Sequence, residues 1–277
     1  MKAGTAVVIN LKNCTQPSQP YVALSRAQNI QQIYIIGKLH EERWFPSNSA
    51  LKELKSCEEQ EEEITNEDRN GTSFVIMSLN VRSLQKHITE IKRIVELKPP
   101  DVVCLQETWI PSNTFDLSSF EVKGYNIHLN SVGRGKGIAT YTSDNFVLIS
   151  QVQQTHIQIS KFSYNHLDVI NVYRSAECKN FETILDSQLD RSKETVIVGD
   201  MNINLNKSGS KQNKLLDFLN ERGLHQLVAR TTHQSGDEEA SLIDHVYASK
   251  EICQKITINK QCVHFSDHDI IFVKIKK

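Results

Sequence analysis

Acidic, amide and imidazole side chains lie at the ends of several apolar runs in this sequence. They are Asn80 after Phe74–Leu79, Glu107 after Val102–Gln106, Asp200 and Asn202 after Val196–Gly199, Asp244 after Leu242–Ile243, and Asp267 and His268 just before Ile270–Ile271. Strand ends and the loops that follow them are where α/β proteins hold ligand groups on a rigid frame. If these ends converge, the sequence predicts one site that contains all seven side chains.

This set of side chains suits the hydrolysis of a phosphodiester. Oxygen ligands with a single histidine and no thiolate favour Mg²⁺ or Mn²⁺ over zinc. Phosphodiester cleavage needs a cation against the phosphate charge, a base for the attacking water, and donors for the oxygens of the transition state. Carboxylates, amides and an imidazole together supply these groups. We therefore expect a divalent-metal site and no other small-molecule cofactor.

The elements that must position these residues alternate between strands and helices beyond residue 72. Apolar periodicity predicts helices at Ser83–Leu97, Phe181–Leu189 and Leu215–Glu221. Strands are predicted at Phe74–Leu79, Asp101–Gln106, Tyr125–Asn130, Gly137–Thr142, Phe146–Gln151, His156–Phe162, Leu167–Tyr173, Thr195–Val198, Leu242–Ala248 and Ile270–Lys276. So many strands with few helices between them argue against a simple doubly wound sheet. They favour an α/β (α+β) fold, a four-layer sandwich of two packed mixed β-sheets flanked by helices.

The chain divides into three zones by composition. Residues 1–45 hold two predicted strands, Thr5–Leu11 and Ile33–Leu39, which are too little for a core of their own. Residues 46–71 are acidic and poor in apolar side chains, as a solvated linker is. Residues 72–277 form the predicted catalytic domain.

Bulk composition excludes little about the substrate. The 32 basic and 33 acidic residues leave a formal net charge of −1, so a nucleic-acid surface would have to be a local feature. The six cysteines are scattered without metal-ligand spacing, which predicts reduced thiols and an intracellular protein. The sequence contains neither a signal-peptide pattern nor an apolar run long enough for a membrane span, so we expect no membrane partner.

Six short motifs occur in an order that resembles the endonuclease/exonuclease/phosphatase superfamily. They are Ser78–Val81, Leu105–Trp109, Asn171–Tyr173, Gly199–Asn202, Ile243–His245 and Ser266–His268. This superfamily includes apurinic-site endonucleases and the target-nicking endonucleases of retrotransposons. The resemblance covers nearly all of residues 72–277, and its strength lies in the order of the motifs. It implies a metal-dependent phosphodiesterase and, with it, DNA as the partner.

The resemblance assigns a metal-binding role to three residues. Glu107 resembles the principal metal ligand of the superfamily, Asn80 the asparagine that supports metal and phosphate, and Asp267 the aspartate near the metal.

The other matched residues take catalytic or substrate-binding roles. Asp200 resembles the aspartate that orients or deprotonates the attacking water, and Asn202 the asparagine that contacts the phosphate. Two positions apart, they are expected on the same side of an extended segment. Tyr173 resembles a tyrosine that hydrogen-bonds the phosphate or the leaving group, and its neighbour Arg174 is predicted to bind substrate.

His268 resembles the histidine that stabilises phosphate charge, and Asp244 the aspartate that orients its imidazole.

Single motifs also fit simpler interpretations. The segment Asp200–Asn202 could be an ordinary turn, and Tyr173 a packing residue. The glycines of Gly133–Gly137 could hold a phosphate, although a hairpin turn explains them better. Arg82 stands where many relatives carry an aspartate, and Ala176 where apurinic endonucleases tend to carry an asparagine. These departures favour the mobile-element branch over a repair enzyme.

The first zone has a resemblance of its own. Tyr21–Arg26 followed by Ile33–Gly37 is similar to the last conserved motif of superfamily-one DNA helicases, nearest those of Helitron-type transposons. Arg26 would match the arginine that reaches the γ-phosphate of the nucleotide. The sequence has no phosphate-binding G-x-x-x-x-G-K-[ST] loop, so we do not expect this chain to hydrolyse ATP alone. The resemblance implies the C-terminal end of a helicase–endonuclease polyprotein of a Helitron-like element, or a truncated gene copy of one. Through the transposon resemblance, it also implies a nuclear protein.

Three functions remain open from the sequence. The first is a DNA endonuclease that nicks a strand and leaves a 3′-hydroxyl. The second is a lipid or inositol phosphate phosphodiesterase of the same superfamily. The third is a transposon-derived fragment that binds DNA without cutting it. The sequence does not indicate the target sequence, the number of metal ions or the oligomeric state.

Overall fold

The computed structural model describes residues 7–10, 33–36, 73–114, 116–234 and 239–277. The chain forms two compact units, residues 1–61 and 62–277. In the first unit, strand β1 (Val7–Asn10) pairs in parallel with β2 (Ile33–Ile36). The helicase-like motif Tyr21–Arg26 lies outside the described residues, and the predicted domain limits at residues 45 and 71 stay predictions.

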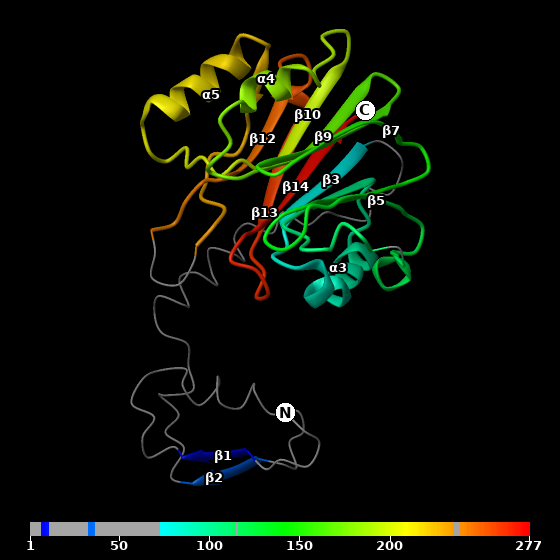
Figure 1. Ribbon diagram of the computed structural model, residues 1–277, viewed down its shortest axis with the longest axis vertical. Helices are drawn as coiled ribbons and strands as arrows, with labels where there is room; N and C mark the ends of the chain where they lie inside the picture. Colours follow the sequence, from blue (N-terminus) through cyan, green and yellow to red (C-terminus); the bar gives the residue numbers. More distant parts are fainter. Residues whose placement is uncertain (1–6, 11–32, 37–72, 115, 235–238) are drawn as a thin grey trace. The chain divides into compact units, whose positions relative to one another are not determined.

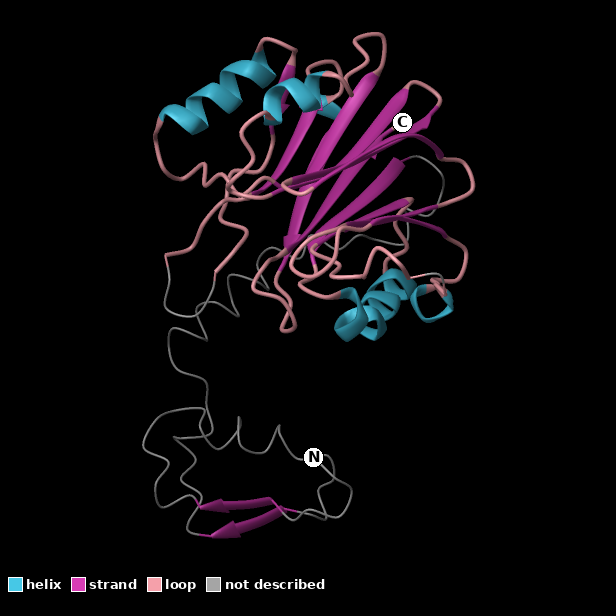
Figure 2. Ribbon diagram, in the orientation of Figure 1, coloured by secondary structure: helices cyan, strands magenta, loops and turns pink. Residues whose placement is uncertain are grey.

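The second unit contains two six-stranded mixed sheets (Figures 1 and 2). The first sheet has the order β13 (Ile256–Gln261), β14 (Ile270–Lys276), β3 (Ser73–Asn80), β4 (Val102–Gln106), β6 (Ile138–Thr142) and β5 (Asn126–Asn130). The second sheet has the order β11 (Leu224–Gln226), β12 (Asp244–Ser249), β10 (Glu194–Asp200), β9 (Leu167–Arg174), β8 (Ile157–Tyr164) and β7 (Val147–Gln154). Each sheet has one parallel pair, β3 with β4 and β9 with β10, and its other pairs are antiparallel.

Helices cover the outer faces of both sheets, which gives four layers (Figure 1). Helix α3 (Leu84–Leu97) packs on the first sheet through Leu84, Ile91 and Val95. Helices α4 (Phe181–Asp186) and α5 (Ser210–Asn220) pack on the second. Two short 3₁₀ turns, η5 (Ser118–Phe120) and η6 (Cys253–Lys255), complete the described elements. None of the described helices has the length and apolar character that a membrane crossing needs.

The central core lies between the two sheets. Alternate residues of each strand point inward, as the twofold period of a strand requires. The first sheet contributes Ile76 and Cys104, and the second contributes Val169, Val198 and Val246, all of them buried. The predicted sandwich of two mixed sheets with outer helices is therefore confirmed.

Individual boundaries differ from the predictions where a local cause intervenes. Helix α5 begins at Ser210 instead of Leu215, because its first turn is polar and carries no apolar period. Strands β11 and β13 were not predicted. The first has only three residues, and every residue of the second is half-buried at a sheet edge. The Gly133–Gly137 segment joins the antiparallel strands β5 and β6, so the hairpin interpretation is confirmed.

Candidate active site

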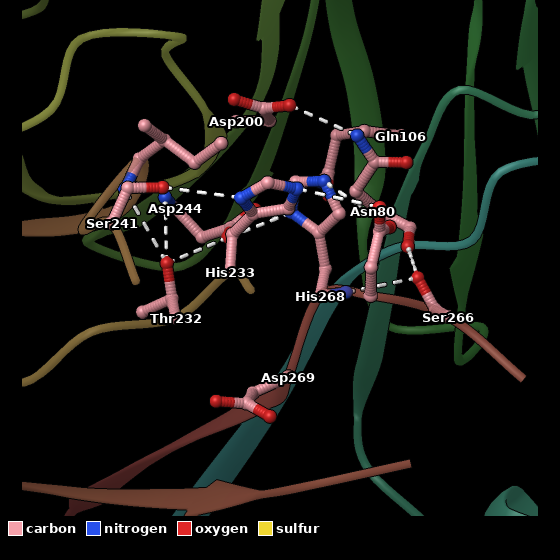
Figure 3. A network of polar contacts seen from close by, with 12 residues as sticks. Asn80, Gln106, Asp200, Thr232, His233, Ser241, Asp244, Ser266, His268 and Asp269 are labelled. Carbon is pink, nitrogen blue, oxygen red and sulfur yellow. Dashed lines mark hydrogen bonds and ion pairs between the residues drawn. The ribbon is translucent and has the colours of Figure 1, made fainter. Parts of the chain in front are cut away.

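The predicted site residues gather where strands of the two sheets end side by side. Asp200 is the last residue of β10, and its register partners are Tyr173 on β9 and Asp244 on β12. Asn80 ends β3 in the first sheet. Its Nδ2 donates a hydrogen bond of 2.9 Å to Oδ2 of Asp200, and both residues are buried (Figure 3). This bond joins the two sheets at the edge where the candidate active site lies.

Gly199 allows β10 to lie close to β9 just before Asp200, at the end of the strand where the candidate active site lies. Its φ of +138° is one that side-chain-bearing residues rarely adopt, and a Cβ there would lie 1.9 Å from the carbonyl oxygen of Val172. The glycine before Asp200 is thus required by the close approach of β9 to β10.

The loops that follow the strands contain most of the strained backbone in the described chain. Positive φ angles at non-glycine residues occur in the site loops at Arg82, Ser83, Glu107, Trp109 and Asn202, and elsewhere among the described residues only at Asn165. Such angles are costly for large side chains and persist where surrounding contacts enforce them. Here, two backbone bonds from the N–H groups of residues 83 and 84 to the carbonyls of residues 107 and 108 tie the loops together.

Asn202 lies in a turn and does not continue the strand. The strand ends at Asp200, the φ of Asn202 is +49°, and Asp200 Oδ1 accepts a 2.8 Å hydrogen bond from the Asn202 backbone N–H. The expectation of an extended segment at this point is therefore wrong. The Asn202 side chain instead donates to the carbonyl oxygen of Arg174 at 2.8 Å.

Asp244 and His268 form the predicted carboxylate–imidazole pair. His268 Nδ1 lies 2.9 Å and 3.1 Å from the two carboxylate oxygens, and Thr232 Oγ1 donates to Asp244 at 2.7 Å (Figure 3). Burial disfavours the charged form of the His268 ring and lowers its pKa. The negative charges of Asp244, Asp200 and Asp267 have the larger effect and raise the pKa of His268 to about 9. The ring therefore carries a proton at neutral pH.

Asp200 lies beside this pair in a fully buried position. One ligand atom each of Asp200, Asp244 and His268 falls within 4.8 Å of the others. Burial and the neighbouring Asp244 raise the pKa of Asp200 above its usual range, and His268 and Asn80 only partly oppose this. A carboxyl group with a raised pKa is better suited to accept a proton from water.

Glu107 and Tyr173 meet at the same edge. The Tyr173 phenol donates to Glu107 Oε1 at 3.3 Å and to the carbonyl oxygen of Gly135 at 3.2 Å, and Trp109 Nε1 donates to Glu107 Oε2 at 3.2 Å. Burial and the charge of Glu107 raise the pKa of Tyr173, so its hydroxyl stays protonated. The β5–β6 hairpin thus borders the candidate active site through a carbonyl group.

Asp267 faces His268 from the loop before β14. Its Oδ1 lies 3.9 Å from His268 Nε2, and its Oδ2 is bound by Arg82 and lies 3.4 Å from His233 Nε2. Burial opposes ionisation of Asp267, but the bond to His233 and the charges of His268 and Arg82 lower its pKa to about 2. Arg82 thus pairs with a predicted metal ligand.

Arg174 points to the other face of the second sheet. Its guanidinium donates to the carbonyl oxygens of Met201 and Cys178, both at 3.0 Å, and lies over the ring of Phe181. Substrate binding by Arg174 stays a prediction, as does the role of Arg26, which falls outside the described residues.

A buried polar layer beneath the site was not predicted. Gln106 Nε2 donates to Asn171 Oδ1 at 2.8 Å, and Asn171 Nδ2 donates to Thr140 Oγ1 at 3.0 Å. These side chains lie inside runs that were predicted as apolar strands, and a sequence pattern does not show which of them meet. These hydrogen bonds join Gln106 and Thr140 of the first sheet to Asn171 of the second.

The predicted metal ligands have donor types that suit a hard divalent cation. Two groups of described acidic and imidazole residues lie close enough to share an ion, and neither includes Glu107; they are Asp200 with Asp244 and His268, and His233 with Asp267 and His268. Carboxylate and amide oxygens of Glu107, Asn80 and Asp267 are the ligand type that Mg²⁺ takes. In addition, Asp267 Oδ1 is buried and accepts no hydrogen bond. A buried carboxylate oxygen without a donor is unusual unless a cation or water meets it.

Comparisons with known proteins agree with this geometry. The family model described as endonuclease-reverse transcriptase matches residues 167–272. The AP endonuclease LMAP from Leishmania major superposes with a TM-score of 0.65 at 14% identity, over 84% of this chain and 100% of that one. The family match is confined to residues 167–272, and at 14% identity the structural match shows a shared fold.

Two further solved structures share the sandwich fold. The endonuclease domain of TRAS1, a telomere-specific non-LTR retrotransposon, gives a TM-score of 0.57 at 14% identity, over 74% of this chain and 98% of that one. A variant of the 3′ phosphatase NExo from Neisseria, bound to a product DNA hairpin, gives a TM-score of 0.59 at 16% identity. The match covers 74% of this chain and 100% of that one. A comparison with curated proteins finds no match.

Proposed function

We propose that residues 72–277 form a Mg²⁺-dependent DNA endonuclease that nicks one strand and leaves a 3′-hydroxyl. The observation that carries the proposal is the contact group of Asp200, Asp244, His268 and Asn80, drawn from both sheets at one edge. It combines a proton acceptor, an oriented imidazolium and one amide side chain, which are the groups that phosphodiester hydrolysis needs beside a metal. The DNA-bound and retrotransposon neighbours favour DNA over a lipid substrate.

Each residue has a task in this proposal. Asp200 takes a proton from water as the water oxygen bonds to phosphorus. The protonated His268, held by Asp244, donates to a phosphate oxygen and stabilises the added charge of the transition state. Tyr173 donates to the phosphate or to the O3′ atom, which leaves as the P–O3′ bond breaks and gains a proton from solvent. Asn202 contacts the phosphate.

The metal would be held by Glu107, Asn80 and Asp267. A bound Mg²⁺ would supply positive charge against the phosphate. Mn²⁺ has the same ligand preference and is expected to substitute. The Helitron-like origin and the nuclear location rest on the resemblance of residues 1–45 alone and are proposed on that basis.

The test is nicking of supercoiled plasmid by the full chain. We expect conversion to the open-circular form in Mg²⁺, none in EDTA, and recovery when Mg²⁺ is restored. Parallel reactions with vesicles containing phosphatidylinositol bisphosphate or sphingomyelin test the lipid alternative. Binding of plasmid without cutting in Mg²⁺ or Mn²⁺ would overturn the proposal in favour of a non-catalytic DNA-binding fragment.

A further inference from the structure

His233, which belongs to none of the six motifs, lies against His268. The two rings have their centroids 4.5 Å apart, and the backbones of the two residues form an isolated β-bridge (Figure 3). A second antiparallel bridge joins His233 to Ser241, close before Asp244 in the sequence. Its side chain is 17% exposed. This imidazole is therefore held at the site by backbone pairing on both sides.

Both imidazoles are oriented through Nδ1, which leaves Nε2 of each ring to face Asp267. His268 Nδ1 bonds Asp244 at 2.9 Å, and His233 Nδ1 lies 3.1 Å from Ser241 Oγ. The two Nε2 atoms lie 3.4 Å and 3.9 Å from oxygens of Asp267. Histidines that bind metals are commonly oriented in this way, with one nitrogen on a polar partner and the other on the metal.

We propose that His233, His268 and Asp267 form a binding site for a transition-metal ion of the Zn²⁺ class. One ligand atom from each residue falls within 4.8 Å of the other two. A tetrahedral ion with bonds of about 2.0 Å holds its ligands roughly 3.3 Å apart, so small side-chain shifts complete the geometry. Two nitrogens and one carboxylate oxygen suit Zn²⁺ or Co²⁺, whereas Mg²⁺ takes oxygen ligands.

Asp267 can serve as the third ligand. Its Oδ1 is buried and accepts no hydrogen bond, so a cation would meet an unsatisfied lone pair. Its Oδ2 is bound by Arg82, whose side chain is 46% exposed and can turn toward water. The fourth position of a tetrahedral ion would be open to water or to a phosphate oxygen, as in sites with three protein ligands.

A bound Zn²⁺ would displace the Nε2 proton of His268 to solvent and occupy that nitrogen. If the proposed nuclease function holds, Zn²⁺ should therefore inhibit Mg²⁺-dependent nicking, because the imidazole could no longer donate to the phosphate. The binding site itself does not depend on that function.

The test is a Co²⁺ titration of the full chain followed by visible absorption, with Zn²⁺ as the displacing ion. We expect the wild type to bind one Co²⁺ with a tetrahedral spectrum that Zn²⁺ abolishes. His233→Gln should weaken binding at least about 100-fold, since it removes a direct ligand. The matched control is His166→Gln, in the exposed turn between β8 and β9, and it should bind as the wild type does.

A second variant keeps the proposal testable if His233→Gln fails to fold. Ser241→Ala retains all three ligands but removes the partner of His233 Nδ1, and we expect about tenfold weaker binding. If folded His233→Gln and Ser241→Ala both bind Co²⁺ with the affinity of the wild type, the proposal is wrong. It is also wrong if the wild type and every variant show the charge-transfer bands of a thiolate ligand. Either result would place the ion elsewhere, and neither bears on whether the chain nicks DNA in Mg²⁺.

Discussion

Two buried groups of charged side chains lie at opposite ends of the second sheet. They differ in the balance between carboxylates and cations. Near the start of β9, Asp168 is fully buried, with Lys161 Nζ at 2.7 Å and Lys193 Nζ at 3.4 Å. At the far end of the neighbouring strands, Asp200 and Asp244 share one imidazole, that of His268. The first cluster has more cationic than anionic groups, and the second has more carboxylates than cations.

We propose that this difference separates a structural cluster from a functional one. A buried carboxylate that two ammonium groups neutralise has little attraction left for a metal ion. Two buried carboxylates with one imidazolium leave a surplus of negative charge that attracts a cation, which is the condition that active sites exploit. The surplus of negative charge, more than the number of acidic residues, marks the candidate active site.

The largest expected effect comes from Glu107→Gln. Loss of a charged oxygen ligand should abolish most Mg²⁺ binding and lower the nicking rate by about 10⁴-fold, because the metal supplies several kcal/mol of transition-state stabilisation. Calorimetric titration with Mg²⁺ and single-turnover nicking would measure both effects. The matched control is Glu194→Gln at the opposite end of β10, which should retain wild-type values. If both variants bind Mg²⁺ and nick DNA equally well, Glu107 is not a metal ligand.

The Asp244–His268 pair should act as a unit. Asp244→Asn and His268→Ala are each expected to lower the nicking rate on the order of 10²–10⁴-fold, the range for a positioned proton-bearing group. The double variant should resemble the slower single variant, because groups that act together are not additive. A double-mutant cycle on single-turnover rates measures this. Losses that multiply in full would mean that the two residues work independently.

Stability should respond to pH through His268. Its pKa is raised to about 9, so the folded chain holds a proton that the unfolded chain releases near pH 6.5. The stabilisation is therefore complete below pH 6.5 and is lost as pH rises toward 9. We expect the unfolding free energy of the wild type, relative to His268→Gln, to fall on the order of 1–3 kcal/mol across that window. Denaturant unfolding at several pH values checks this, and a difference that grows with pH would contradict it.

The smallest effect should come from removing residues 1–71. Every proposed site residue lies beyond this segment, and the acidic stretch before residue 72 predicts few contacts across the boundary. We expect nicking within about tenfold of the full chain, or about 1.4 kcal/mol. A truncated chain that does not fold would show that the proposed boundary is wrong.

The sequence predicted the strands that carry the site residues better than the contacts among the side chains of the site. Apolar runs such as Val102–Gln106 and Val196–Gly199 located the strand ends, and placement of polar groups directly after them indicated the site. The pairing of Asp244 with His268 came from the resemblance, and the structure brings these two residues into contact.

The sequence could not show features that depend on contacts between distant segments. The turn at Asn202 follows from a bond between its backbone and Asp200, whereas its spacing from Asp200 equally fits a strand. His233 lies in a stretch of sequence without any periodicity, and only its β-bridge to His268 reveals that these two residues meet. Gly199 looks like an ordinary strand residue until the structure shows that a Cβ there would lie 1.9 Å from the carbonyl oxygen of Val172.

The most direct test of the charge-balance account compares Asp200→Asn with Asp168→Asn in one experiment. Single-turnover nicking in Mg²⁺ is measured per folded molecule, alongside the free energy of unfolding. Asp200→Asn should lose about 10⁴-fold in rate without a loss of stability, since it removes a buried charge that lacks a full counterion.

Asp168→Asn should lose on the order of 3–5 kcal/mol of stability, because it leaves two ammonium groups without their partner, and should keep its nicking rate. If Asp168→Asn loses as much rate per folded molecule as Asp200→Asn, or if Asp200→Asn nicks like the wild type, the distinction between the two clusters is wrong.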